Sequence, residues 1–566
     1  MGNDLDAIRN SLKEEIETKI NNTGNEVLNF SKEEMKITQL SCHEVQKLIL
    51  DKEKSLSLPF LFNAFHFAKQ QEMNSHCSMT DVFYFEPLSR AYKLQRSIDF
   101  NDKEEIEKFP LLGFVFSIKE YINIKGSRST WGVLIGLNKF ADENPKLIDF
   151  ITSKGALIVC KGNVPQLLMI YESTNNLFGN CSNPTNSLRV SGGSSGGEAA
   201  SIALGLVNVG IGSDIGGSIR VPSLFCGIYG FKPTAGRVDD CDAFSCLENT
   251  KMDGKTGDNQ YVVEPTIGPM GKSARDCTTV MKVLIEFSLT KTDLPPVPWR
   301  EANNPMRVGI ISEFSPYLKQ PDCCTRALHE ASLLLKQANV QIVPINLNHV
   351  SEEILVNTLA LFFMDKEFRE ILLEETIIKE PLTDGYSSIM ELIRYPLWIL
   401  QNLSKSDLMS ARDKLVIKAA IISRTSNQIS IKYNQTKIVR SVLKEFEKAK
   451  IDVALAYGLI PAPLIGKTAG LEHYFLYTYC WNFLNFPAGA VPMTTVYENE
   501  QFYEGELNDS CDHIITDLMK DSKGLPIGIQ VVGVPWKDEL VLKTMELIEE
   551  LKLKKNKSAV TFLKRF

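Results

Sequence analysis

The most informative stretch of the chain runs from residue 191 to residue 223 and reads SGGSSGGEAASIALGLVNVGIGSDIGGSIRVPS. It contains two Gly-Gly-Ser turns, at 192–194 and 216–218, with a helical segment and a strand-like segment between them. Glycines beside a serine allow positive φ angles and let the backbone approach a ligand closely. They also leave successive N–H groups free to point into one concavity, as an oxyanion requires. The block therefore predicts a reactive serine beside a backbone oxyanion site.

Two other interpretations of this block are weaker. A flexible Gly/Ser tether has no use for the apolar runs that interrupt the block, or for Asp214 and Arg220, which bracket the second turn. Residues 192–196 match the G-x-S-x-G pattern of a nucleophile elbow, but an elbow must follow a strand. Residues 179–191 are polar and rich in turn formers, so we interpret that match as accidental.

A reactive serine needs a base, and none of the seven histidines lies near the block in the sequence. Lysine can serve if burial brings its pKa down from about 10.4 toward neutral. Lys119 is the candidate because it follows the apolar run LLGFVFSI (111–118), where a charge is costly unless it is paired or neutralised. A lysine that snorkels from a strand end has the same spacing. The residues alone leave both interpretations open.

Apolar runs of strand length recur along the chain. They lie at 111–119, 155–160, 206–212 and 524–533, with helical patterns between them, for example at 324–338 and 437–450. This alternation predicts an α/β protein, a single α/β/α sandwich around one large, mixed and twisted sheet. We expect a loose or helical leader over 1–35, one domain over 36–556 and a C-terminal tail over 557–566.

The composition is that of an ordinary globular protein, with 44% apolar and 23% charged residues and a net charge of -7. Its basic residues are dispersed, which argues against nucleic-acid binding. The twelve cysteines form no C-x-x-C pair, the chain begins with polar residues, and no H-E-x-x-H metal spacing occurs. We therefore expect a cytoplasmic protein that is not secreted, with reduced thiols and no metal or cofactor.

The glycine-serine block is accompanied by further motifs: LLGFVFSIKE (111–120), GNVPQLLMIYESTNNLFGNCSNP (162–184), GIYGFKPTAGRV (227–238), TIGPMGKSARD (266–276) and GLPIGIQVVG (524–533). Together they resemble the amidase signature family, and within it the fatty-acid amide hydrolases, most of all the second type. The resemblance extends from about Ile37 to residue 550. It implies hydrolysis of a carboxylic amide to a free acid and an amine through an acyl-enzyme. The substrate that it implies is a long-chain fatty-acid amide or an N-acyl amine.

The resemblance assigns roles to residues that match the family pattern. It makes Ser218 the nucleophile, Ser194 a relay serine on a cis peptide bond, and Lys119 the base. The other assigned residues are the oxyanion donors Ile215, Gly216, Gly217 and Ser218 (by their N–H groups), the acyl-site residues Leu168 and Met169, and the turn supports Asp214 and Arg220.

The region 386–412 begins with YSSIMELIRYPLWILQNL and gathers apolar side chains around Pro396, with Arg394, Lys405 and Arg412 nearby. It predicts either an amphipathic cap that rests on a membrane, with Trp398 at the interface and the basic residues toward lipid headgroups, or a pair of buried core helices. The resemblance favours the cap, and with it a lipid amide substrate and a peripheral membrane contact. A homodimer is a further expectation from the resemblance.

Two alternative functions remain. The amidase subunit of a transfer-RNA glutamine-dependent amidotransferase shares the triad, but it would need partner subunits and a polar glutamine pocket; the apolar cap, Leu168 and Met169 argue against it. The other alternative is a catalytically idle lipid-binding or scaffold protein on the same fold. The complete set of triad residues argues against that function.

Overall fold

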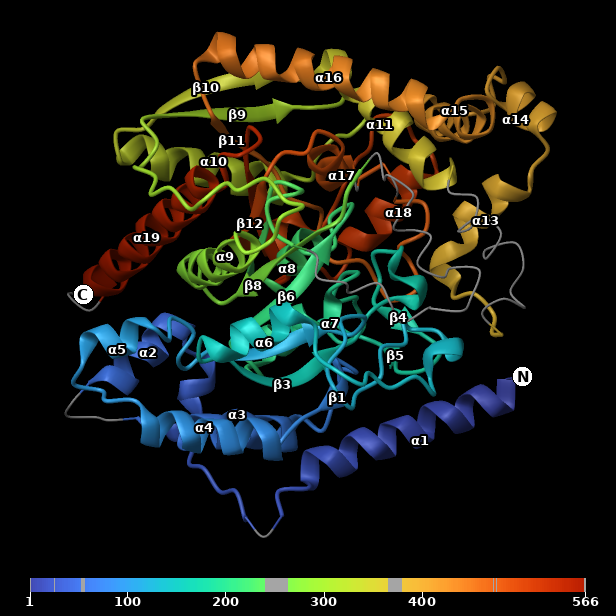
Figure 1. Ribbon diagram of the computed structural model, residues 1–566. Coiled ribbons are helices and arrows are strands. Elements are labelled where there is room, and N and C mark those ends of the chain that lie inside the picture. Colours follow the sequence, from blue (N-terminus) through green and yellow to red (C-terminus); the bar gives the residue numbers. More distant parts are fainter. Residues whose placement is uncertain are drawn as a thin grey trace.

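One mixed sheet of eleven strands runs through the protein in the order β1-β3-β2-β6-β8-β7-β12-β13-β11-β9-β10 (Figure 1). The computed structural model describes residues 2–24, 26–51, 56–239, 263–364, 379–471, 473–474 and 476–563. The strands are β1 (Met79–Val82), β2 (Val115–Lys119), β3 (Leu157–Gly162), β6 (Val209–Asp214), β7 (Tyr229–Lys232), β8 (Thr266–Gly271), β9 (Arg307–Glu313), β10 (Gln341–Asn346), β11 (Val453–Tyr457), β12 (Ala488–Thr495) and β13 (Pro526–Gly533). The four strands predicted from apolar runs correspond to β2, β3, β6 and β13.

The arrangement of β2 in this sheet places Lys119. Strand β2 lies between β3 and β6 and is parallel to both. The carboxyl ends of parallel strands meet at the same edge of a sheet, where α/β proteins form their sites. Lys119 ends β2 and Asp214 ends β6, so the two residues lie at this edge.

Helices cover both faces of the sheet, which confirms the predicted α/β/α class (Figure 1). Helices α7 (Gly196–Leu204) and α8 (Arg220–Cys226) pack on the central strands on one side. On the other side lie α9 (Ala274–Ser288), α10 (Asp322–Gln337) and α19 (Asp538–Leu563). One apolar cluster joins the sheet to α8, α9, α10 and α19, and a second apolar cluster includes Ala199 and Ile202 of α7.

The N-terminal region before β2 combines several helices with one strand. It contains helices α2 (Cys42–Leu50), α3 (Leu58–Glu72) and α4 (Phe85–Ser97), but strand β1 interrupts them and pairs antiparallel with β3. Its four residues are too short to give a recognisable alternation. Helix α1 (Gly2–Asn21) buries apolar side chains in the same apolar cluster as α3 and α7, and Lys19 Nζ lies 2.7 Å from Asp81 Oδ1 of β1.

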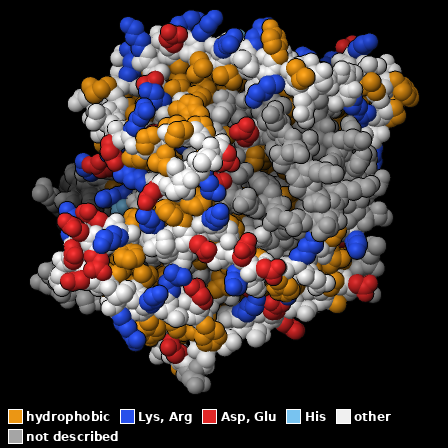
Figure 2. Space-filling model, viewed as in Figure 1, with side chains coloured by type: hydrophobic (Ala, Val, Ile, Leu, Met, Phe, Trp, Pro, Cys, Tyr) orange, Lys and Arg blue, Asp and Glu red, His pale blue; other side chains and the backbone are white. Residues whose placement is uncertain are grey.

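The predicted cap region forms helices α13 (Ser387–Arg394), α14 (Leu397–Leu403) and α15 (Ala411–Thr425). Trp398 is 64% exposed and Leu408 is 96% exposed, whereas Leu400 is buried in the core. Figure 2 shows apolar side chains gathered with basic ones at the upper right, where Figure 1 places α14. The segment therefore has one buried and one exposed apolar side.

Arg412 corrects the expectation that the basic residues of this region point outward. It is 1% exposed, and its guanidinium lies 3.0 Å from Asp509 Oδ1 and 3.0 Å from Asp512 Oδ1. A buried guanidinium needs such partners, so Arg412 is a structural residue. Arg394 and Lys405 are exposed as expected.

The remaining described helices and chain ends complete the fold. Helix α16 (Gln428–Ala449) covers the predicted helix at 437–450 except for its last residue. Helix α11 (Asn348–Met364) packs against both α16 and α17 (Leu476–Phe483). The backbone of α19 continues through most of the expected tail, and residues 564–566 are outside the described ranges. Among the described helices, none is long and apolar enough to cross a bilayer.

Candidate active site

Lys119 is fully buried at the end of β2 (0% exposed). Its Nζ lies 2.8 Å from Ser194 Oγ and 3.1 Å from Ser213 Oγ. Burial lowers the pKa of Lys119 to about 7 because the ammonium loses its water, although the carboxylates of Glu198 and Asp214 act in the opposite direction. A large fraction of this amine is then neutral near neutral pH and can accept a proton.

The first serine turn is shaped by glycine and stands against α8. Gly192 has φ +92°, and a Cβ on it would lie 2.6 Å from Pro222 Cα. No other residue fits this conformation and this close approach. The following Gly193–Ser194 peptide bond is cis, as the resemblance implies. The turn ends at the start of α7, and Ser194 Oγ faces Lys119 Nζ.

Ser218 lies on the second turn, between β6 and α8, and is 7% exposed. The N–H of Ser195 donates to the carbonyl oxygen of Ser218 at 3.1 Å, which places the two turns side by side. Among the described residues, no hydrogen bond joins Ser194 Oγ to Ser218 Oγ. Catalytic hydrogen bonds are often long without substrate and tighten when it binds.

Asp214 and Arg220 brace the second turn. Arg220 Nε lies 3.0 Å from Asp214 Oδ2, and Arg220 Nη2 lies 3.0 Å from Asp214 Oδ1, with both side chains fully buried. Burial raises the pKa of Asp214, but the Arg220 charge and hydrogen bonds outweigh it and hold this pKa at about 2. Arg220 Nη1 also donates to Thr478 O and to Gln530 Oε1, so the pair ties the turn to α17 and β13.

The N–H groups expected to form the oxyanion site are not equivalent. That of Gly217 donates to Asp214 Oδ1 at 2.7 Å, so a substrate oxyanion would have to share it. In the described part of the chain, Asp214 makes no such bond with the N–H groups of Ile215, Gly216 and Ser218. Gly217 itself has φ +131°, and a Cβ there would lie 2.5 Å from Thr478 Oγ1, so only glycine fits.

Leu168 and Met169 lie on a loop that packs against the cap region. Leu168 has φ +64°, and both side chains are half-buried. Met169 packs on a small apolar cluster that includes Ile170, Tyr386 and Met390, the last two from the cap region. Tyr386 OH also donates to the carbonyl oxygen of Gln166 at 2.5 Å. Of the two expected acyl-site residues, Met169 therefore packs with the cap region, whereas Leu168 packs against the main core.

Several residues at the site were missed by sequence reasoning. Ser213 contacts Lys119 and directly precedes Asp214, so its place in the block was a usable signal. Thr478 Oγ1 donates to Gly216 O at 2.9 Å, and Asn482 Nδ2 donates to Asp214 Oδ1 at 2.9 Å. These two residues come from α17, far along the chain, and no local pattern marks them. Glu198, buried on α7, was also overlooked.

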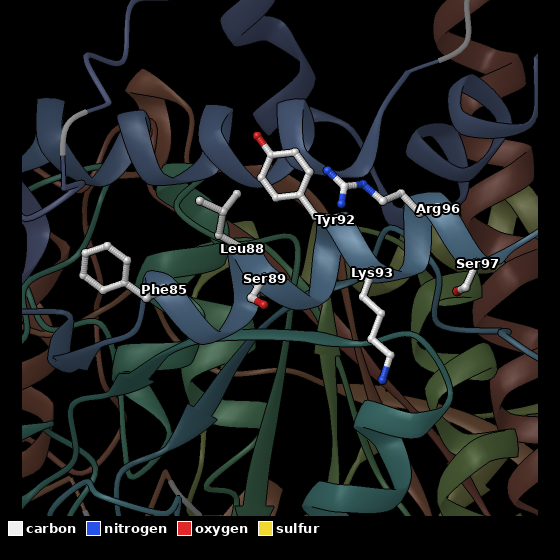
Figure 3. Close-up of a pocket in the computed structure, with 7 residues that line it drawn as sticks. All are labelled: Phe85, Leu88, Ser89, Tyr92, Lys93, Arg96 and Ser97. Carbon is white, nitrogen blue, oxygen red and sulfur yellow. The ribbon is translucent and has the colours of Figure 1, made fainter.

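A surface groove is lined by residues of α4. Figure 3 shows its lining residues, which all project from α4 and include the exposed rings of Phe85 and Tyr92. The groove contains none of the residues assigned by the resemblance. We assign it no part in the reaction.

Comparisons with known proteins agree with the fold. The chain is 31% identical to "Fatty-acid amide hydrolase 1" of Sus scrofa over 456 residues, which cover 78% of this chain and 76% of that protein. It is 28% identical to "Fatty acid amide hydrolase 1" of Caenorhabditis elegans over 465 residues, 78% of this chain and 77% of that one. A solved structure of "Fatty acid amide hydrolase" matches with a TM-score of 0.76 and 22% identity over 97% of this chain and 94% of that chain.

The fold and these relatives define the protein as an enzyme that hydrolyses amides. The chain belongs to the amidase family, whose model, described as "Amidase", matches residues 66–542.

Proposed function

We propose that the protein hydrolyses amides of long-chain fatty acids with a Ser-Ser-Lys triad formed by Ser218, Ser194 and Lys119. The observation that carries this proposal is the 2.8 Å contact between Lys119 Nζ and Ser194 Oγ in a fully buried setting. A lysine whose pKa is lowered by burial can act as a general base at neutral pH. Reaction of Ser218 with a fluorophosphonate, detected on the labelled peptide, tests the assignment of the nucleophile.

The proposed reaction transfers one proton back and forth along the triad. Neutral Lys119 accepts the proton of Ser194 while Ser194 accepts the proton of Ser218, and Ser218 Oγ attacks the carbonyl carbon. The proton then returns through Ser194 to the leaving nitrogen, the C–N bond breaks and an acyl ester remains on Ser218. Water attacks this ester, which releases the free acid and restores Ser218.

The developing oxyanion is stabilised by backbone N–H groups of the second turn. Those of Ile215, Gly216 and Ser218 are the primary donors, and Gly217 contributes while its N–H is shared with Asp214. Removal of one such donor in a serine hydrolase typically costs about 100-fold to 1000-fold in rate. The bonds from Thr478 Oγ1 and Tyr171 OH to Gly216 O fix the orientation of this turn before substrate arrives.

Three observations support a lipid acyl group. Relatives of this chain are named for fatty-acid amides. Met169 packs in an apolar cluster with residues of the cap region. The same region exposes Trp398 and Leu408 with Arg394 and Lys405 nearby, a combination that suits the boundary between lipid headgroups and acyl chains.

A series of amides with increasing acyl length tests the acyl group. We expect kcat/KM to rise roughly fourfold per methylene until the site is filled, because each buried methylene contributes about 0.8 kcal/mol. Met169→Gln should reduce kcat/KM for long chains by about tenfold and leave a short-chain amide nearly unaffected, since the polar amide opposes only the acyl tail. Met306→Gln, at an exposed methionine elsewhere, is the matched control. Equal kcat/KM across the series would contradict the lipid assignment.

Sedimentation with vesicles of phosphatidylcholine and phosphatidylserine tests the membrane contact. We expect the wild-type protein to sediment with the vesicles and the Trp398→Asp, Leu408→Asp double variant to bind at least about tenfold more weakly. Phe85→Asp removes an exposed ring from α4 and serves as the control. Hydrolysis of a water-soluble amide should be the same in all three proteins. Equal sedimentation of the double variant and the wild type would rule out this surface as the contact.

A further inference from the structure

Glu198 is a fully buried carboxyl group on α7, directly behind the proposed base (0% exposed). Its side chain occupies space that two glycines leave open on neighbouring strands. A Cβ at Gly162 of β3 would lie 2.0 Å from Glu198 Oε1, and a Cβ at Gly210 of β6 would lie 3.1 Å from its Cγ. The carboxyl group is therefore held over β2, between β3 and β6, and any larger residue at 162 would displace it.

The contacts of Glu198 connect it to the strand that carries Lys119. Ser117 Oγ donates to Glu198 Oε1 at 3.2 Å, and among the described residues Oε2 has no hydrogen-bond partner. Ser117 and Lys119 are two residues apart on β2, so their side chains project from the same face of the strand. A buried charge without enough partners is costly, which makes the nearby ammonium of Lys119 the natural counter-charge.

The other ionisable groups around Glu198 and Lys119 do not provide this counter-charge. Asp214 also acts on Lys119, but its charge is already paired with Arg220. Cys160 of β3 and Cys181 are buried thiols whose pKa values are raised by burial, and to a smaller extent by the charge of Glu198, so they stay neutral. Beyond Cys160 lies the buried amine of Lys69, which donates to the carbonyl oxygens of Phe65 and Leu206.

We propose that Glu198 is a positioning residue that sets the basicity of Lys119, because its carboxylate stabilises the ammonium formed when Lys119 takes the proton from Ser194. This inference rests on the proposed triad. Burial raises the pKa of Glu198 and the Lys119 charge lowers it, which is the reciprocal effect expected for two coupled groups.

The rate of labelling by an alkyl fluorophosphonate, measured against pH, tests this role without a substrate. In this reaction Ser218 Oγ attacks phosphorus, the P–F bond breaks, and the serine proton passes through Ser194 to Lys119. At pH values below the pKa of Lys119 the rate constant decreases, because the ammonium cannot accept this proton. Glu198→Gln removes the negative charge and disfavours the ammonium, so we expect the acid limb to move down by about 1 pH unit. We expect the maximal rate constant to fall about threefold, because the base is weaker.

Two further variants separate charge from structure. Glu198→Asp keeps the charge and should leave the acid limb near its wild-type position, whatever its effect on the maximal rate. Ser117→Ala removes the hydrogen bond that favours the carboxylate and should move the limb in the same direction as Glu198→Gln by a smaller amount; it supplies the readout if Glu198→Gln does not fold. Wild-type protein that is not labelled overturns the proposed triad, and the inference with it. Labelled variants with an unmoved acid limb overturn only the role of Glu198.

Discussion

Ser218→Ala is expected to abolish amide hydrolysis, with kcat reduced by about 10⁵-fold or more, since removal of a triad nucleophile in a serine hydrolase costs on that order. The hydroxyl is the group that forms the acyl ester, and no other serine can take its position between β6 and α8. Turnover of a fatty-acid amide by purified protein, followed by mass spectrometry of the released acid, measures the effect.

The matched control for this variant is Ser223→Ala, within α8. Ser223 is also buried, and its Oγ donates to the carbonyl oxygen of Ile219, a contact that belongs to the helix rather than the site. Both variants should unfold at temperatures close to that of the wild type, and Ser223→Ala should retain most of the activity. Normal hydrolysis by a folded Ser218→Ala protein would show that another residue is the nucleophile.

The serine turns could be predicted from sequence because their chemistry is local. Each needs glycines with unusual conformations beside the serine, and Gly192 and Gly217 do have positive φ angles and close contacts with other segments. Lys119 was harder. Its spacing alone favours a snorkelling lysine over a base, and the family resemblance is needed to choose the base. Its complete burial and its contact with Ser194 depend on the tertiary structure and leave no local pattern in the sequence.

The rest of the site depends on contacts between distant segments. Asn482 and Thr478 of α17 reach the second turn through tertiary contacts, in which Arg220 donates to Thr478 O and to Asn482 Oδ1. Arg412 was expected at a lipid surface, but Asp509 and Asp512 lie far along the chain and hold it inside the protein. Glu198 is within the most informative stretch of the sequence and was still overlooked, because helix periodicity does not reveal which buried polar group faces β2.

Lys119→Met has the second large expected effect. Methionine keeps most of the volume of the side chain and removes the amine, so the fold should be preserved while Ser194 loses its proton acceptor. General-base catalysis typically contributes about 10² to 10⁴ in rate, and we expect a loss of about 10³-fold in kcat/KM at neutral pH. Lys69→Met, at a buried lysine that donates to backbone carbonyls, is the matched control and should keep the wild-type pH profile.

The pH dependence distinguishes the loss of a base from general damage at the site. In the wild type, the amine of Lys119 is neutral above its lowered pKa of about 7, so kcat/KM should fall as the pH drops through that value. Without the amine, deprotonation of Ser218 depends on hydroxide, so kcat/KM of Lys119→Met should rise about tenfold per pH unit in the alkaline range and show no acid limb near pH 7. The deficit of the variant is therefore largest at neutral pH and shrinks as the pH rises. An acid limb that survives unchanged in Lys119→Met would mean that a different group accepts the proton.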